Sequence, residues 1–188
     1  MNTKPFFEEK INCRIKNFLN TDIYQMLGGS NILFSEKDLQ KIIDICSQKD
    51  CYEMIFKRRL NGGPYLLKDA VSYTNWVMEG WRNHSHFAFI VRNNTGEFIG
   101  TLDIKSPDLD NAEVGCWADE NYRGFMTNAF KELIALAKNA GYKKLYARIK
   151  SENSRSYNMV MRSGFIKIEE RLRTDGLLEF IYEITLND

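Results

Sequence analysis

The 188-residue chain has little of several features that mark specialised classes of protein. It contains only three prolines, its net charge is +1, and no apolar run approaches the roughly 18–20 residues that span a bilayer. Such an even charge gives no reason to expect binding to nucleic acid or to an anionic membrane surface. The opening stretch MNTKPFFEEKINCR becomes charged too soon for a signal peptide, so we expect a cytoplasmic protein.

Cysteine and histidine are also sparse. The two histidines lie together in NHSHF (83–87), and no cluster of cysteines or carboxylates accompanies them. The cysteines form no CxxC pair, which predicts free thiols in a reducing compartment and no metal site. The four cysteines are Cys13, Cys46, Cys51 and Cys116.

What is present is ordinary for a soluble globular domain: 44% apolar and 27% charged residues. The length suits one sizeable core and is marginal for two. We find no internal repeat, low-complexity stretch or linker, so we predict a single domain over residues 1–188.

The first half of the chain is predicted to be mainly helical after one strand. Residues 11–18 alternate and predict a strand, and 21–27 read as a short helix that starts near Asp22 and is broken by GGS. Ser35 and Asp38 form a capping-box pattern ahead of an apolar stripe, which predicts a helix. Residues 51–60 are ambiguous, and a further helix is expected over 68–82. That helix should bury Val71, Trp76 and Val77, and its aromatic side chains, with those of Tyr73 and Trp81, are expected in the core.

The second half alternates strands and helices. A hairpin is predicted from FAFIV (87–91), the turn NNTG and EFIGTLDI (97–104), followed by a third strand at 112–118. A helix over 124–140 ends at Gly141 and precedes a strand (143–149), a short helix (153–163) and a final strand pair (165–172 and 177–186). This order predicts an α/β domain with a mixed, mostly antiparallel twisted sheet of about six or seven strands flanked by helices.

Three stretches in this order and spacing resemble the GNAT acetyltransferase superfamily, and within it the RimJ/RimL-like branch. They are AEVGCWADENYRGFMTNAF (112–130), the strand KKLYARI (143–149) and NSRSYNMVMRSGF (153–165). The approach GGPYLLKDA (62–70) is also similar to that branch. The resemblance covers nearly the whole chain and implies acetyl-CoA as the acyl donor. It assigns residues 1–86 to the acceptor side and 87–188 to an acetyl-CoA-binding core.

The start of the 124–140 helix resembles the loop that holds the CoA pyrophosphate in this family. Unpaired helix N–H groups and the positive end of the helix dipole attract an anion there, Gly124 permits close backbone approach, and Arg123 adds a charge. Compared with the family loop, two residues are missing, either after YRG or before Tyr122. We therefore expect the cofactor to bind this tighter loop less strongly. The resemblance implies that the binding residues are Arg123, Gly124, Phe125, Met126 and Thr127.

The resemblance further places the pantetheine arm beside the strand at 112–118. Cys116, Trp117 and Ala118 hold the positions whose backbone would contact the arm. Asn153 matches a partner of the pantetheine amide, although asparagine is equally a good helix N-cap, and both roles are compatible. Tyr157, in the same helix, is also expected to border the cofactor.

Acetyl transfer to an amine needs a group that takes the proton of the amine and one that protonates the leaving thiolate. Glu113 is the candidate base, a lone carboxylate in an apolar strand whose pKa we expect burial to raise. The alternative is a solvated strand residue or a member of an ion pair. The tyrosine that serves as proton donor in many GNAT enzymes is replaced by Val160. Ser156, three residues after Asn153, is the substitute donor, or else a capping hydroxyl.

The resemblance favours a protein N-terminal amine as acceptor, acetylated by direct attack in a ternary complex. A small amine such as a polyamine or an aminoglycoside is the alternative, although the mixed charge of segments 20–34 and 51–82 does not favour a polycation. The run Lys57, Arg58 and Arg59 reads as a solvated face, or as a contact for an acidic substrate. The rival class is a non-catalytic acyl-CoA-binding protein on the same scaffold, and either would work as a monomer or a homodimer.

Overall fold

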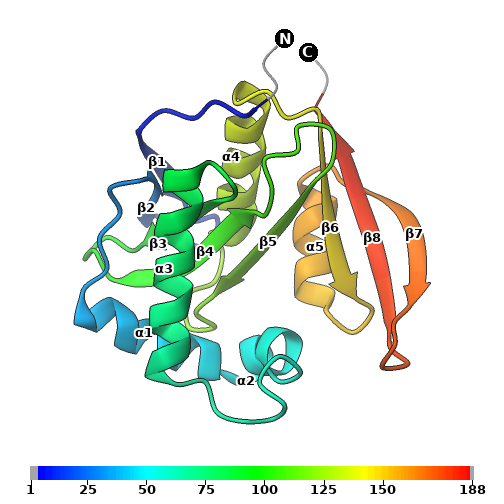
Figure 1. Cartoon of the computed structure of the whole chain (residues 1–188), viewed down its shortest axis with the longest axis horizontal. Helices are drawn as coiled ribbons and strands as arrows, with labels where there is room; N and C mark the ends of the chain where they lie inside the picture. Colours follow the sequence, from blue (N-terminus) through cyan, green and yellow to red (C-terminus); the bar gives the residue numbers. More distant parts are fainter. Residues whose placement is uncertain (1–3, 187–188) are drawn as a thin grey trace.

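The computed structural model describes residues 4–186, which form one eight-stranded sheet flanked by helices (Figure 1). The strand order is β1-β2-β3-β4-β5-β6-β8-β7. The strands are β1 (Lys10–Lys16), β2 (Ile23–Gly29), β3 (Phe87–Arg92), β4 (Phe98–Ile104), β5 (Ala112–Ala118), β6 (Lys144–Lys150), β7 (Ile166–Leu172) and β8 (Leu178–Thr185). The helices are α1 (Glu36–Ser47), α2 (Lys49–Cys51), the π-helical turn η1 (Tyr52–Phe56), α3 (Leu67–Asn83), α4 (Met126–Asn139) and α5 (Ser154–Arg162).

The sheet has one strand more than the upper limit of the prediction because the segment read as a helix near Asp22 is strand β2. It pairs with β1 over its whole length and with β3 over residues 25–27. Tyr24 and Met26 are buried, at 2% and 0% exposure, while Gln25 between them is exposed. This two-residue period is the signature of a strand and overrides the weak helix-start signal.

Helix α1 begins as its sequence predicted. The Ser35 hydroxyl accepts the backbone N–H of Asp38 at 3.2 Å, and the Asp38 carboxylate accepts the Ser35 N–H at 2.8 Å. In α3 the prediction was partly wrong: Val77 is buried, but Val71 is 39% exposed and Trp76 is half-buried. The buried side of α3 instead runs through Ala70, Thr74, Gly80 and Trp81.

The two faces of the sheet are covered by different helices. On one face, Tyr73 of α3 donates a hydrogen bond to Thr101 Oγ1 at 2.7 Å, and its ring lies 5.2 Å from that of Trp117. On the other face, Cys116 Sγ lies 3.8 Å from Met159 Sδ of α5. Successive residues of β5 therefore contact opposite layers, α3 with η1 and α4 with α5.

Strands β5 and β6 form the one parallel pair among the described strands, and they separate soon after it starts. Only Ala112 and Glu113 of β5 are in register with β6, opposite Leu145 and Tyr146. Beyond them the strands diverge, as Figure 1 shows between the β5 and β6 arrows. From Val114 onward, the edge of β5 that faces β6 is open to another hydrogen-bonding partner.

Candidate active site

Two adjoining cavities occupy the gap between the diverging strands. The larger has a volume of about 790 Å³ and reaches α3, the loop after η1, β6 and the β7–β8 turn. The smaller has a volume of about 240 Å³ and reaches the start of α4 and one side of α5. Cys116, Trp117, Asn153 and Ser156 line both cavities, so the two spaces meet at β5 and the start of α5.

The smaller cavity is suited to a polyanion. Gly124, Met126 and Thr127 line it where α4 begins, and no side chain caps that helix at Phe125. The first amides of an uncapped helix point outward and carry partial positive charge. Arg155 and Arg162 of α5 also line this cavity, together with the carboxylates of Asp50 and Glu120, and Asp50 pairs with Arg155 at 2.8 Å. Sequence reasoning did not single out the two arginines.

Gly124 is required by its surroundings as well as by its conformation. Its φ is +91°, and a Cβ atom there would collide with Asn17 Oδ1 and lie 2.7 Å from Leu19 Cγ. The side-chain amide of Asn17 donates to the Arg123 carbonyl at 2.7 Å, and the Phe18 N–H donates to the Gly124 carbonyl at 2.9 Å. The β1–β2 turn thus holds the shortened loop in place.

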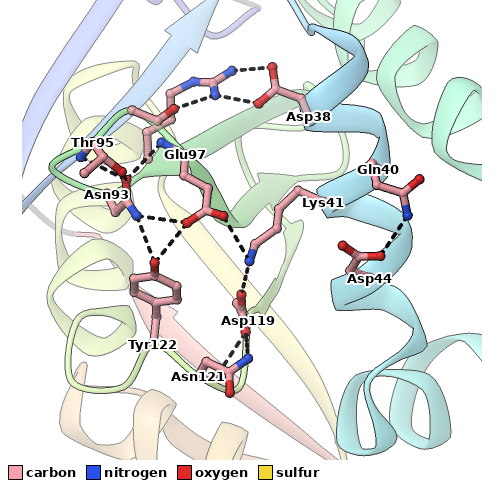
Figure 2. A network of polar contacts seen from close by, with 12 residues as sticks. Asp38, Gln40, Lys41, Asp44, Asn93, Thr95, Glu97, Asp119, Asn121 and Tyr122 are labelled. Atoms are coloured by element: carbon pink, nitrogen blue, oxygen red, sulfur yellow. Dashed lines mark hydrogen bonds and ion pairs between the residues drawn. The ribbon is translucent and has the colours of Figure 1, made fainter.

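A charged network fixes the other end of that loop (Figure 2). Lys41 of α1 lies 2.9 Å from Asp119 and 3.2 Å from Glu97, and the Tyr122 hydroxyl donates to Glu97 at 2.9 Å. Asp119 is buried, which alone would raise its pKa, but the bonds from Lys41 and Gln48 outweigh burial and hold the pKa below its usual value. The loop therefore enters α4 from a rigid support.

Glu113 lies in the larger cavity but is not the free base that the sequence suggested. It is 2.5 Å from Lys105 Nζ and 2.9 Å from an Arg148 nitrogen. Burial would raise its pKa, yet the hydrogen bonds and charges of these two cations outweigh burial and lower it. The expected rise in the pKa of Glu113 is therefore wrong, and the ion-pair alternative describes its state.

Asp103 of β4 is a second carboxylate in the larger cavity, and sequence reasoning missed it. It is 7% exposed, and its Oδ1 atom has no hydrogen-bond partner among residues 4–186. Burial raises the pKa of Asp103, with a further rise from Glu113 and opposing effects from Lys105 and His86. A buried carboxylate with an unsatisfied oxygen beside a cavity has the properties of a proton acceptor.

Helix α5 presents its first turn to both cavities. Asn153 is the N-cap, and its side-chain oxygen accepts the Ser156 N–H at 3.0 Å, so the capping role is confirmed. Ser156 is half-buried at the junction of the cavities. Tyr157 is 44% exposed, its ring lies 6.0 Å from that of Tyr182, and it borders neither cavity.

Most of the residues assigned to cofactor binding lie on a cavity wall. Those that do are Cys116, Trp117, Ala118, Gly124, Met126, Thr127 and Asn153. Besides Tyr157, two do not: the Arg123 side chain is exposed, and Phe125 is fully buried with its ring 5.3 Å from that of Tyr24. Phe125 faces the core because the tight loop turns its side chain toward β2.

The aromatic residues of α3 divide between core and cavity. Trp81 is in the core and donates its indole N–H to the Ala88 carbonyl at 2.7 Å, as predicted. Tyr73 and Trp76 instead line the larger cavity, with ring centroids 6.1 Å apart in a stacked arrangement.

The four cysteines carry free thiols. Within residues 4–186 no three His, Cys, Asp or Glu side chains gather as a metal site would require. The same part of the chain contains no helix with the length and apolarity needed to cross a bilayer.

Comparison with known proteins agrees with this architecture. An uncharacterized protein of Methanocaldococcus jannaschii is 26% identical over 128 residues, which cover 65% of this chain and only 26% of that protein. Similar folds occur in the microcin C7 self-immunity acetyltransferase MccE, solved with acetyl-CoA and AMP (TM-score 0.71, 17% identity, 89% of this chain and 94% of that one). A second is Mycobacterium smegmatis RimJ, solved with CoA-disulfide (TM-score 0.70, 16% identity, 93% of this chain and 86% of that one). A third is Vibrio cholerae spermidine N-acetyltransferase, solved with CoA and spermine (TM-score 0.67, 13% identity, 87% of this chain and 95% of that one).

These structural likenesses, all at low identity, show a shared fold. The sequence model of the GNAT acetyltransferase domain matches residues 32–166, which is most of the chain. The chain therefore belongs to the GNAT family of acetyl-CoA-dependent acetyltransferases.

Proposed function

We propose that this domain transfers an acetyl group from acetyl-CoA to a primary amine by direct attack in a ternary complex. The observation that carries the proposal is the meeting of two cavities at β5: one leads to the uncapped start of α4, and the other contains an unpartnered buried carboxylate. Donor and acceptor can then lie in separate spaces and react where the spaces join, so that positioning supplies much of the rate enhancement.

The donor fits the smaller cavity and the open edge of β5. The pyrophosphate would lie at the amides of Met126 and Thr127, with Arg155 and Arg162 nearby. The pantetheine arm would run along the unpaired backbone of residues 116–118, which can hydrogen-bond its amides as a neighbouring strand would.

Asp103 is a better candidate than Glu113 for the base that removes a proton from the acceptor ammonium. Asp103 has a free oxygen atom and a raised pKa, whereas Glu113 is held by two cations. The neutral amine then attacks the thioester carbon to form a tetrahedral intermediate. As the carbon–sulfur bond breaks, the nitrogen gives up its second proton and the thiolate leaves. The Ser156 hydroxyl lies at the junction of the cavities, where it would hydrogen-bond the thiolate and relay to it the second proton of the nitrogen, so that the products are the amide and the free thiol of CoA.

The fold is shared by enzymes with different acceptors and does not by itself identify the amine that is acetylated. The sequence resemblance favours a protein N-terminal amine, and one neighbour of the same fold is a ribosomal-protein-S5-alanine acetyltransferase of Vibrio fischeri (TM-score 0.70, 17% identity). The neighbour from Vibrio cholerae is a spermidine acetyltransferase. The lining of the larger cavity is therefore the better guide to the acceptor.

Two measurements test the proposal. Isothermal titration should show acetyl-CoA binding in the micromolar range, and thiol release should follow when a suitable amine is added. Absence of binding up to millimolar acetyl-CoA would refute the proposal. Tight binding without turnover of any amine would support a non-catalytic acyl-CoA-binding protein instead.

A further inference from the structure

The wall of the larger cavity is strongly cationic. Six of its side chains carry positive charge (Arg58, Arg59, Lys105, Arg148, Lys150 and Arg173), and three carry negative charge (Asp103, Glu113 and Glu179). The wall thus has an excess of three positive charges, although the whole chain carries a net charge of only +1. This concentration of charge distinguishes the cavity from the rest of the molecule.

The carboxylates of the wall do not neutralise this excess. Glu113 pairs with both Lys105 and Arg148, and Arg173 pairs with Asp175 at 2.8 Å as well as with Glu179 at 3.6 Å. Within the described residues, Arg59 and Lys150 have no carboxylate partner, and Arg58 has only a 3.4 Å contact with Asp175 at the β7–β8 turn. Several cationic groups are therefore available to a bound anion.

These cations come from chain segments that converge on the cavity from two sides. Arg58 and Arg59 follow η1, whereas Arg173 begins the β7–β8 turn, and the Arg58–Asp175 contact joins the two segments. Asp103 lies in the sheet, on β4. An acceptor with its amine at Asp103 can therefore extend its other end toward the arginines, with its carbon skeleton beside Tyr73 and Trp76.

From this arrangement, and resting on the proposed acetyl transfer, we propose that the acceptor is a small amine that carries one or two phosphate groups. A phosphate monoester has a charge of about −1.5 to −2 near pH 7, so phosphate matches the excess better than a single carboxylate does. Arginine forks bind phosphate oxygens in pairs. A volume of about 790 Å³ is also that of a small-molecule site rather than a peptide groove.

The test compares two amines that differ only by phosphate, ethanolamine and O-phosphoethanolamine, with saturating acetyl-CoA and thiol release as the readout. We expect kcat/KM to be at least about tenfold higher for the phosphorylated amine, and this advantage to fall about tenfold in an Arg58→Gln/Arg59→Gln variant. Lys57→Gln is the matched control, because Lys57 is exposed, pairs with Glu53 and does not line the cavity. It should retain the preference.

Equal kcat/KM for the two amines, or a preference for spermidine, would overturn the phosphate inference while leaving acetyl transfer intact. A higher kcat/KM for the N-terminus of an acidic peptide would overturn the small-molecule part. If no amine is acetylated, calorimetry with inorganic pyrophosphate on the CoA-saturated protein decides the inference separately. Binding weakened about tenfold by Arg58→Gln/Arg59→Gln supports the anion site, and absent binding or binding unchanged by the variant overturns it.

Discussion

Asp103 of β4 lies opposite Gly115 of β5, and a Cβ atom on Gly115 would be only 3.0 Å from Asp103 Oδ1. The same Cβ would be 3.2 Å from Lys105 Nζ. The absence of a side chain at position 115 therefore leaves room for the carboxylate at the edge of the cavity, where a substrate can reach it.

We expect Asp103→Asn to lower kcat by about 10²–10⁴-fold, the usual contribution of a general base. The raised pKa of Asp103 means that the carboxylate takes up a proton as pH falls, so wild-type activity should decline toward acid pH. The asparagine variant should lose that decline. Glu113→Gln is the matched comparison, and it should retain the pH dependence with a smaller loss of kcat. A pH–rate profile that changes only in the Glu113 variant would assign the base to Glu113.

Ser156→Ala should lower kcat about tenfold or more, with little change in the KM for acetyl-CoA, because the hydroxyl is needed only when the thiolate leaves. Ser154→Ala, at an exposed position in the same helix, is the control and should be silent. Steady-state thiol release measures both. Unchanged kcat in Ser156→Ala would remove this hydroxyl from the mechanism.

Gly124→Ala should weaken acetyl-CoA binding and lower the melting temperature, since the new methyl group collides with the β1–β2 turn. Gly141→Ala is a close control: its φ is +98°, similar to the +91° of Gly124, but a Cβ there meets no atom within 4 Å. The difference between the two variants isolates the collision from the backbone strain. Calorimetric binding and thermal melts that are identical for both would contradict the role given to the turn.

Lys41→Met should destabilise the protein by about 2 kcal/mol at pH 7, because it leaves the buried Asp119 carboxylate without its cation. Since the folded-state pKa of Asp119 is lowered, the pair stabilises above the unfolded pKa of about 4 and less as pH falls through the folded value. Urea titrations at pH 7 and below pH 4 should show the difference shrinking in acid. Lys57→Met, at an exposed pair, should leave stability unchanged. A difference for Lys41→Met that does not vary with pH would rule out this explanation.

Much of the fold was predictable from local patterns. The apolar stripe of the helix at α4, the capping box of Ser35 and the alternation in β5 each act over a few residues, so they are visible in sequence. The error at β2 arose from weighting Asp22 as a helix start over the alternation of Tyr24 and Met26. The strand is fixed by pairing with β1 and β3, which a local signal does not contain.

The site was harder to predict because its properties depend on residues that are distant in sequence. In the sequence Glu113 is a lone carboxylate in an apolar strand, but in the fold Arg148, 35 residues away, lies beside it. Asp103 was not predicted as a site residue because it lies in a strand whose seven residues are all buried. The space beside its carboxylate depends on the glycine opposite it in the neighbouring strand. The charge of the larger cavity likewise appears only when η1, β6 and the β7–β8 turn converge.

The separation of β5 from β6 also bears on how the molecule holds together. Among residues 4–186, only two residue pairs join the half of the sheet that contains β1–β5 to the half that contains β6–β8. The two halves also share one hydrophobic core. A ligand that hydrogen-bonds both edges of the gap would act as a missing strand and add to the cohesion of the two halves. The acyl donor would then support the fold as well as react, and we expect amide hydrogens of β6 and β8 to exchange more slowly when it is bound.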